Sequence, residues 1–223
     1  MQKKRYFITF ICASAIFFVP LQIEIWFQEK ILGIVNIYFW ILRLAALLGH
    51  KKARKLVKGQ RQAMGELEQW VASFNGDQVL WFHVASVGEF EQARPIIERL
   101  HEELPFCKVL LTFFSPSGYE LRKNYSMVDK VTYLPFATRR NAKKMIKILP
   151  LKAAIFVKYE FWPAYLKTLK KNAIPTYLIS AIFRPGQLFF LPWGRGYKKL
   201  LTCFHKTRNG AVCGAPIFKG LKR

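Results

Sequence analysis

Strand-like and helix-like stretches alternate along the middle of the chain. Apolar runs of strand length occupy residues 79–86, 107–113, 130–134, 153–157 and 175–180. Between them, apolar residues recur at helical spacing over about 90–103, 117–124, 138–148 and 161–172. A run that is apolar at every position, such as Ala153 to Val157, indicates a strand buried on both faces, which is typical of parallel sheets. The pattern therefore predicts an α/β fold with a Rossmann-like parallel sheet, in which strands and crossover helices alternate.

Two further apolar runs, residues 6–23 and 31–48, precede the first predicted strand. Three cations lie before the first run, and a dense basic segment follows the second. Because basic flanks stay on the cytoplasmic side, this pattern predicts that residues 1–50 form a membrane anchor of one or two helices. Arg43 inside the second run favours an alternative in which that run lies in the membrane interface, since a charge within the bilayer is costly.

The remainder of the chain divides by composition into three parts. Residues 51–76 are predicted to be a basic helix or linker beside the membrane, and residues 77–201 the Rossmann-like domain. Residues 202–223 form a basic tail of atypical sequence, which we expect to be poorly ordered. Acidic residues stop altogether after Glu160.

The net charge of the chain indicates which classes of partner it can bind. In 223 residues, 36 Lys and Arg oppose 13 Asp and Glu, giving a net charge of +23. A hydrophobic content of 52% excludes a disordered chain, so the charge points to an anionic partner of a folded protein. Neither a base-reading helix nor an RNA-binding aromatic motif accompanies it, which argues against nucleic acid. The remaining candidate partners are an anionic membrane surface and a phosphorylated ligand.

Two basic groups are the candidates for that contact. They are Lys51, Lys52, Arg54 and Lys55 in the first group, and Arg139, Arg140 and Lys143 in the second. The alternative for the second group is an ordinary solvated helix surface. The four cysteines, Cys12, Cys107, Cys203 and Cys213, show no paired spacing, so we predict no metal site.

Polar side chains also gather where the predicted strands end. They are Ser86, Gly88, Glu89, Ser115, Ser117, Gly118, Glu160 and Arg184. Because the carboxyl ends of parallel strands meet at one edge of a sheet, we expect these residues to line one rim, where open α/β sheets bind ligands. A carboxylate there accepts a proton from a substrate, or it stabilises the start of a helix. Serine and glycine are common in turns, but two carboxylates and an arginine beside them favour a site.

Several short motifs occupy these strand ends in a fixed order. They run from His83 to Glu89, Leu111 to Gly118, Tyr133 to Pro135 and Tyr159 to Pro163, followed by Ile174–Pro175, Ser180–Ala181 and Arg184. Over roughly residues 31–200, their order and spacing resemble the N-terminal domain of bacterial Kdo transferases. These are the 3-deoxy-manno-octulosonic acid transferases of lipid A glycosylation.

The resemblance implies a two-domain GT-B glycosyltransferase on the cytoplasmic face of the bacterial inner membrane. Such enzymes move Kdo from CMP-Kdo to a hydroxyl of a lipid A precursor, by one inverting displacement and without a cofactor. The family's catalytic base is the carboxylate of the first motif, which is Glu89 here. The resemblance also implies that Glu160 positions the acceptor, and that Ser115, Ser117 and Gly118 admit its sugar and phosphate groups.

The chain also departs from the family. Ala137, Lys158 and Ala164 replace residues of its acceptor-side motifs. In the family, a second Rossmann-like domain supplies most donor contacts. We expect this chain to be a truncated form without that domain, which alone transfers Kdo poorly or not at all. Two alternatives remain: another lipid-directed GT-B glycosyltransferase, and a non-catalytic half-domain that only binds membrane or lipid.

Overall fold

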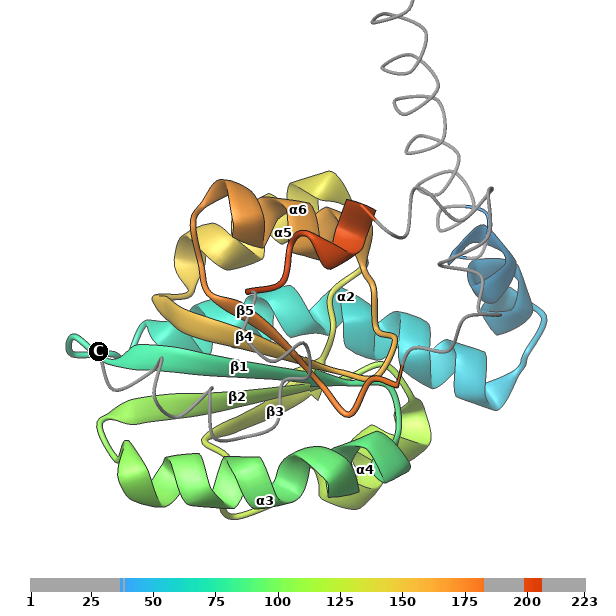
Figure 1. Ribbon diagram of the computed structural model, residues 1–223. Coiled ribbons are helices and arrows are strands. Elements are labelled where there is room, and N and C mark those ends of the chain that lie inside the picture. Colours follow the sequence, from blue (N-terminus) through green and yellow to red (C-terminus); the bar gives the residue numbers. More distant parts are fainter. Residues whose placement is uncertain (1–36, 38, 183–198, 206–223) are drawn as a thin grey trace, which may run out of the picture. The chain divides into compact units, whose positions relative to one another are not determined.

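The computed structural model describes residues 37, 39–182 and 199–205 of the chain (Figure 1). The chain divides into two compact units, Met1–Phe39 and Trp40–Arg223, and the first lies almost wholly outside the described residues. In the second unit the helices are α2 (Lys51–Val71), α3 (Val87–Glu103), α4 (Pro116–Arg122), α5 (Arg139–Ile148) and α6 (Pro163–Lys171). The strands are β1 (Gln78–Val84), β2 (Cys107–Phe113), β3 (Lys130–Tyr133), β4 (Leu151–Val157) and β5 (Thr176–Ile179).

The five strands form one parallel sheet in the order β3-β2-β1-β4-β5. The predicted Rossmann-like α/β fold is therefore confirmed. The chain winds outward from β1 to β3 and then returns to the other side of β1 for β4 and β5. This reversal makes β1 and β4 the topological switch point, where open sheets of this kind bind their ligands.

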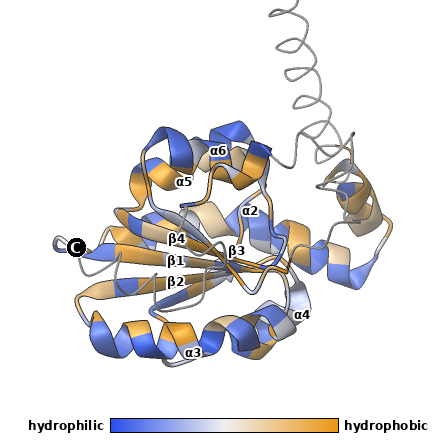
Figure 2. Cartoon of the chain, in the orientation of Figure 1, coloured by the Kyte–Doolittle hydropathy of each residue, from blue (hydrophilic) through white to orange (hydrophobic). Residues whose placement is uncertain are grey.

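Helices cover both faces of the sheet, with α3 and α4 on one face and α2, α5 and α6 on the other (Figure 1). Alternate residues of β1 supply the two cores, because successive side chains of a strand point to opposite faces. Leu80 and Phe82 join the cluster that includes Ile97 of α3. Trp81 points the other way, with its ring centroid 5.4 Å from that of Tyr165 in α6. Figure 2 shows the same division as apolar strands between amphipathic helices.

Helix α2 packs against the sheet as part of the same unit. Its buried side chains are Ala53, Leu56, Gln60, Ala63 and Leu67. Gly59 lies so close to Tyr133 that an added Cβ would be 2.3 Å from the ring, which explains a glycine in mid-helix. Glu66 of α2 accepts a hydrogen bond from Thr132 of β3, with 2.7 Å between the oxygens. The domain limits at residues 51 and 77 stay predictions.

Residues 40–47 are helical and precede α2. Leu42 packs against the cluster around Tyr133, and the guanidinium of Arg43 lies 4.8 Å from the ring centroid of Phe136. Both contacts involve residues at the carboxyl edge of the sheet. The opposite side of this segment leaves large apolar side chains in solvent: Trp40, Ile41, Leu44, Leu47 and Leu48.

No helix among the described residues is long and apolar enough to cross a membrane. The anchor predicted over residues 1–50 therefore finds no support in the part of it that the structure describes. Residues 1–36 and 38, which include the first apolar run, lie outside the described residues.

Candidate functional site

The switch point brings together the loops that carry the predicted site residues. Ser86 lies in the loop from β1 to α3, Gly88 and Glu89 lie in the first turn of α3, and Glu160 lies in the loop from β4 to α6. The turn after β2 lies on the other side of β1, since the backbone N–H of Ser115 donates to the carbonyl of Ala85 at 2.8 Å. Seven of the eight residues expected at the rim therefore lie at three adjacent strand-to-helix junctions. Arg184 lies outside the described residues.

Glu89 is a half-buried carboxylate in the first turn of α3. Ser86 adopts an extended backbone before the helix, and the Glu89 side chain turns back so that Oε2 accepts a hydrogen bond from the Ala85 N–H at 2.6 Å. Burial raises the pKa of Glu89 above its ordinary value. The Ala85 hydrogen bond opposes this rise, the charge of Glu160 adds to it, and His83 and Lys158 act against it. The net rise makes Glu89 a better proton acceptor than an exposed carboxylate.

The serines of the rim have hydroxyls that do not cap their helices. Ser86 and Ser115 are the N-cap residues of α3 and α4, and neither side chain makes a cap hydrogen bond. The Ser115 and Ser117 hydroxyl oxygens lie 2.7 Å apart and share a hydrogen bond. These hydroxyls are suited to bind polar groups of a ligand at the rim.

The two rim glycines have different reasons to be glycine. A Cβ on Gly118 would lie 2.6 Å from the Phe113 ring, so Gly118 is needed for packing. A Cβ on Gly88 would meet nothing within 4 Å. Packing therefore does not explain Gly88, which leaves room at the helix start beside Glu89.

Glu160 belongs to a polar cluster that sequence reasoning missed. Its Oε2 lies 3.3 Å from Nε2 of His83 and accepts a hydrogen bond from the indole N–H of Trp162 at 2.8 Å. His83 is fully buried, whereas the Glu160 side chain is 18% exposed. Burial raises the pKa of Glu160, but the hydrogen bond and the charge of His83, together with the hydrogen bond from Trp162, outweigh it, so this pKa lies below its ordinary value. Glu160 is therefore the more acidic carboxyl of the two and stays charged when Glu89 gains a proton.

One signal in the sequence could have revealed this cluster. His83 and Thr112 are polar residues inside otherwise apolar strands, and polar groups in such positions need hydrogen-bond partners. The sequence alone does not show which residues these partners are.

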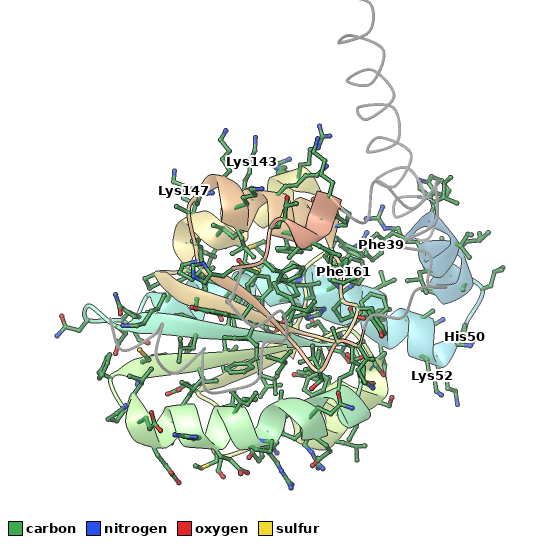
Figure 3. All side chains as sticks on the ribbon, viewed as in Figure 1. Phe39, His50, Lys52, Lys143, Lys147 and Phe161 are labelled. Atoms are coloured by element: carbon green, nitrogen blue, oxygen red, sulfur yellow. The ribbon has the colours of Figure 1, made fainter. Side chains whose placement is uncertain are left out.

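The predicted basic groups lie on two different helices. Lys51, Lys52 and Arg54 are exposed at the start of α2, and Lys55 beside them pairs with Glu120 at 3.2 Å. Arg139, Arg140 and Lys143 are exposed at the start of α5. Figure 3 shows Lys52 pointing outward from α2, and Lys143 and Lys147 outward from α5.

Both of these helices begin against the usual electrostatic preference. Neither has an acidic residue in its first turn, although a helix N-terminus favours anions and disfavours cations. The local cost of these cations is consistent with an anionic partner. Among the described residues, no group of three His, Cys, Asp or Glu side chains could hold a metal ion. Of the four cysteines, Cys12 and Cys213 lie outside the described residues.

Comparison with known proteins gives a consistent set of relatives. The chain is 36% identical over 103 residues to 3-deoxy-D-manno-octulosonic acid transferase of Aquifex aeolicus (strain VF5), which is 46% of this chain and 28% of that protein. It is 30% identical over 112 residues to the Haemophilus influenzae protein of the same name, covering 49% and 26% of the two chains. A probable mitochondrial 3-deoxy-D-manno-octulosonic acid transferase of Arabidopsis thaliana is 27% identical over 104 residues, 46% of this chain and 23% of the plant protein.

The match thus spans about a quarter of the length of these curated relatives. A family model described as 3-deoxy-D-manno-octulosonic-acid transferase (kdotransferase) matches residues 53–207. This range includes β1 to β5 and all three loops of the candidate site. The resemblance found in the sequence is confirmed, and the chain belongs to the 3-deoxy-D-manno-octulosonic-acid transferase family.

Proposed function

We propose that this chain is the acceptor-side half of a glycosyltransferase that transfers Kdo from CMP-Kdo to a lipid A precursor during lipopolysaccharide synthesis. Its family supports the reaction class, and its fold supplies a ligand-binding edge at the switch point between β1 and β4. The proposal rests on the position and environment of Glu89. It is a half-buried carboxylate of raised pKa, held at that edge by the Ala85 N–H.

The proposed reaction is a single displacement. The Ala85 N–H holds Oε2 of Glu89, which leaves Oε1 to accept the proton of the acceptor hydroxyl. The hydroxyl oxygen attacks the anomeric carbon of Kdo as its proton moves to Glu89, and CMP leaves with the electron pair of the broken C–O bond. One displacement inverts the anomeric configuration. Glu160, which stays ionised, orients hydroxyls of the acceptor sugar, and the serine hydroxyls of the rim bind its polar groups.

The helical segment 40–47 supports a lipid acceptor. It packs on residues at the carboxyl edge of the sheet and exposes Trp40, Leu44 and Leu47 beside that edge. Cations at the start of α2 follow immediately. Apolar side chains next to cations bind an anionic membrane surface. We propose that this surface is the cytoplasmic face of the bacterial inner membrane, and that the acceptor's acyl chains remain in the bilayer.

The test is Kdo transfer by the recombinant chain, measured as CMP release and as the mass gain of a lipid A precursor in mixed micelles. The chain is assayed alone and together with the separately produced C-terminal half of a longer Kdo transferase. We expect little or no turnover alone and measurable turnover in the mixture. Glu89→Gln should lower that turnover by about 100-fold or more, the usual contribution of a general base.

Thermal unfolding of the same variant provides the control. Because the fold disfavours the ionised form of Glu89, Glu89→Gln should not lower the melting temperature. Turnover with UDP-sugars instead of CMP-Kdo would identify a different glycosyltransferase. If neither sample turns over, binding decides: a chain that does not prefer vesicles containing lipid A precursor over vesicles without it contradicts the proposal.

A further inference from the structure

A line of buried polar groups leads from the middle of the sheet to Glu160. The Trp81 indole N–H donates to the Thr112 hydroxyl at 2.8 Å, and that hydroxyl donates its own hydrogen to the Phe82 carbonyl at 3.2 Å. The Thr112 oxygen therefore meets Nδ1 of His83, 2.9 Å away, with a lone pair. The second atom near Nδ1 is the Thr112 carbonyl oxygen at 3.2 Å, which also only accepts. This arrangement of acceptors around Nδ1 favours a hydrogen on that nitrogen of His83.

The other ring nitrogen of His83 faces the rim. Nε2 lies 3.3 Å from Oε2 of Glu160 and 3.0 Å from the indole nitrogen of Trp162. The indole can only donate, and its N–H is within hydrogen-bond distance of both Nε2 of His83 and Oε2 of Glu160, which is the closer of the two at 2.8 Å. Without a hydrogen on Nε2, the lone pairs of Nε2 and Oε2 would face each other and share one indole N–H. A hydrogen on Nε2 removes this repulsion, because Nε2–H and the indole N–H then both donate to Oε2 of Glu160. With hydrogens on both ring nitrogens, His83 is a cation paired with the Glu160 carboxylate.

We propose that His83 is a positioning residue of the site. Its Nδ1–H anchors the ring on Thr112, and its Nε2–H donates to Glu160, so that His83 and Trp162 together fix the direction of that carboxylate beside Glu89. His83 is fully buried, so it acts on a ligand only through Glu160. The consequence for acceptor binding rests on the proposed function, whereas the hydrogen-bond arrangement does not.

The charged groups around this pair come from three elements. Glu89 belongs to α3, Lys158 and Glu160 follow β4, and His83 lies in β1. His83, Lys158 and Glu160 all act on the charge of Glu89. A Glu160 carboxylate that turned away would change this balance as well as lose contact with the acceptor. Fixing its direction therefore serves both the binding of the acceptor and the basicity of Glu89.

The test compares two variants of His83 in the full chain. In His83→Asn the side-chain amide takes the place of Nδ1, so it reaches Thr112 but not Glu160. In His83→Gln the amide takes the place of Nε2 and still donates to Glu160. Carboxyl-carbon NMR titration of Glu160 is the readout, and thermal unfolding reports whether each variant folds. We expect the pKa of Glu160 to rise in His83→Asn, because burial then acts against fewer donors, and to stay near the wild-type value in His83→Gln.

Two further measurements keep the test decisive if a His83 variant fails to fold. In the wild-type chain, nitrogen NMR shifts of His83 should show hydrogens on both ring nitrogens while Glu160 is ionised. An unprotonated Nε2 under these conditions overturns the proposal. Trp162→Phe removes only the indole donor and keeps a ring near Phe114, so it should raise the pKa of Glu160 as well.

The Kdo-transfer assay separates this inference from the proposed function. His83→Asn should raise the KM for the acceptor about tenfold and leave the KM for CMP-Kdo unchanged, with His83→Gln restoring most of the loss. If Glu160 titrates as expected, but no sample transfers Kdo and the chain does not prefer vesicles containing lipid A precursor, the proposed function fails and the positioning role stands. If Kdo is transferred but Glu160 titrates alike in all variants, the positioning role is wrong.

Discussion

Glu89 and Glu160 lie at the same edge of the sheet, but their surroundings shift their pKa values in opposite directions. Burial keeps the pKa of Glu89 high, whereas donors from His83 and Trp162 bring that of Glu160 below its ordinary value. Opposite shifts in neighbouring acids are how one site obtains both a proton acceptor and a permanent anion. The separation of roles proposed here follows from these contacts.

Replacing Glu160 with Gln should move the acid limb of the reaction to lower pH. The charge of Glu160 raises the pKa of Glu89 and acts on it more strongly than the charge of His83, so its removal lowers that pKa. Glu89 accepts a proton only when ionised, and the ionised form then persists at lower pH. The pH profile of kcat/KM for Kdo transfer measures this shift, and carboxyl-carbon titration of Glu89 checks it without turnover.

Glu98→Gln is the matched control, because Glu98 also belongs to α3 but accepts its hydrogen bond from Tyr125, away from the switch point. It should leave the acid limb in place. An acid limb that stays fixed in Glu160→Gln would mean that the two carboxylates are not coupled.

The sequence predicts those site residues that directly follow a strand, because their position depends only on where the strand ends. Glu89 and Ser115 follow apolar runs directly, and parallel strands bring such ends together whatever their side chains do. The His83 contacts could not be predicted, because they need the strand order and the register. His83 pairs with Thr112 across β1 and β2, and with Phe156 across β1 and β4. Only this register places Thr112 and Phe156 beside the His83 ring.

At the level of elements, α2 shows how a basic sequence hides a packing surface. Its cations dominate the composition of residues 51–76, which led to the prediction of a juxtamembrane helix or linker. Its buried positions are small or apolar apart from Gln60, and they recur at helical spacing. That spacing was the available signal, but the sequence did not show which surface it would meet.

Two glycines of α2 offer a matched test of its packing. Gly59→Ala places a Cβ 2.3 Å from the Tyr133 ring, whereas Gly65→Ala places one where nothing lies within 4 Å. Overpacking costs about 1–3 kcal/mol, and alanine in place of glycine adds about 1 kcal/mol of helix stability. Gly59→Ala should therefore lower the melting temperature, and Gly65→Ala should raise it. Equal shifts in denaturation would contradict the close approach of α2 to β3.

On the scale of the molecule, the segment 40–47 should decide binding to a membrane. The double variant Leu44→Gln/Leu47→Gln removes two exposed apolar side chains, 51% and 81% accessible, from the proposed contact. Each buried leucine contributes about 1.5–3 kcal/mol, so vesicle binding should fall by roughly tenfold or more. Co-sedimentation with vesicles containing anionic lipid measures the loss.

Leu121→Gln is the control, since Leu121 of α4 is 64% exposed but lies outside this segment. It should bind vesicles like the unchanged chain. Higher salt should weaken the vesicle binding of both Leu121→Gln and the unchanged chain, because the cations at the start of α2 are exposed and salt screens their charge. If Leu121→Gln loses as much binding as the double variant, the segment has no special role.

The exposed apolar side chains beside the strand ends also affect how substrate arrives. A protein held by this face meets its acceptor by lateral diffusion in two dimensions, while a water-soluble donor arrives from the bulk. Its rate would then follow the mole fraction of acceptor among the surrounding lipids, and inert lipid added at constant total acceptor would slow the reaction by surface dilution.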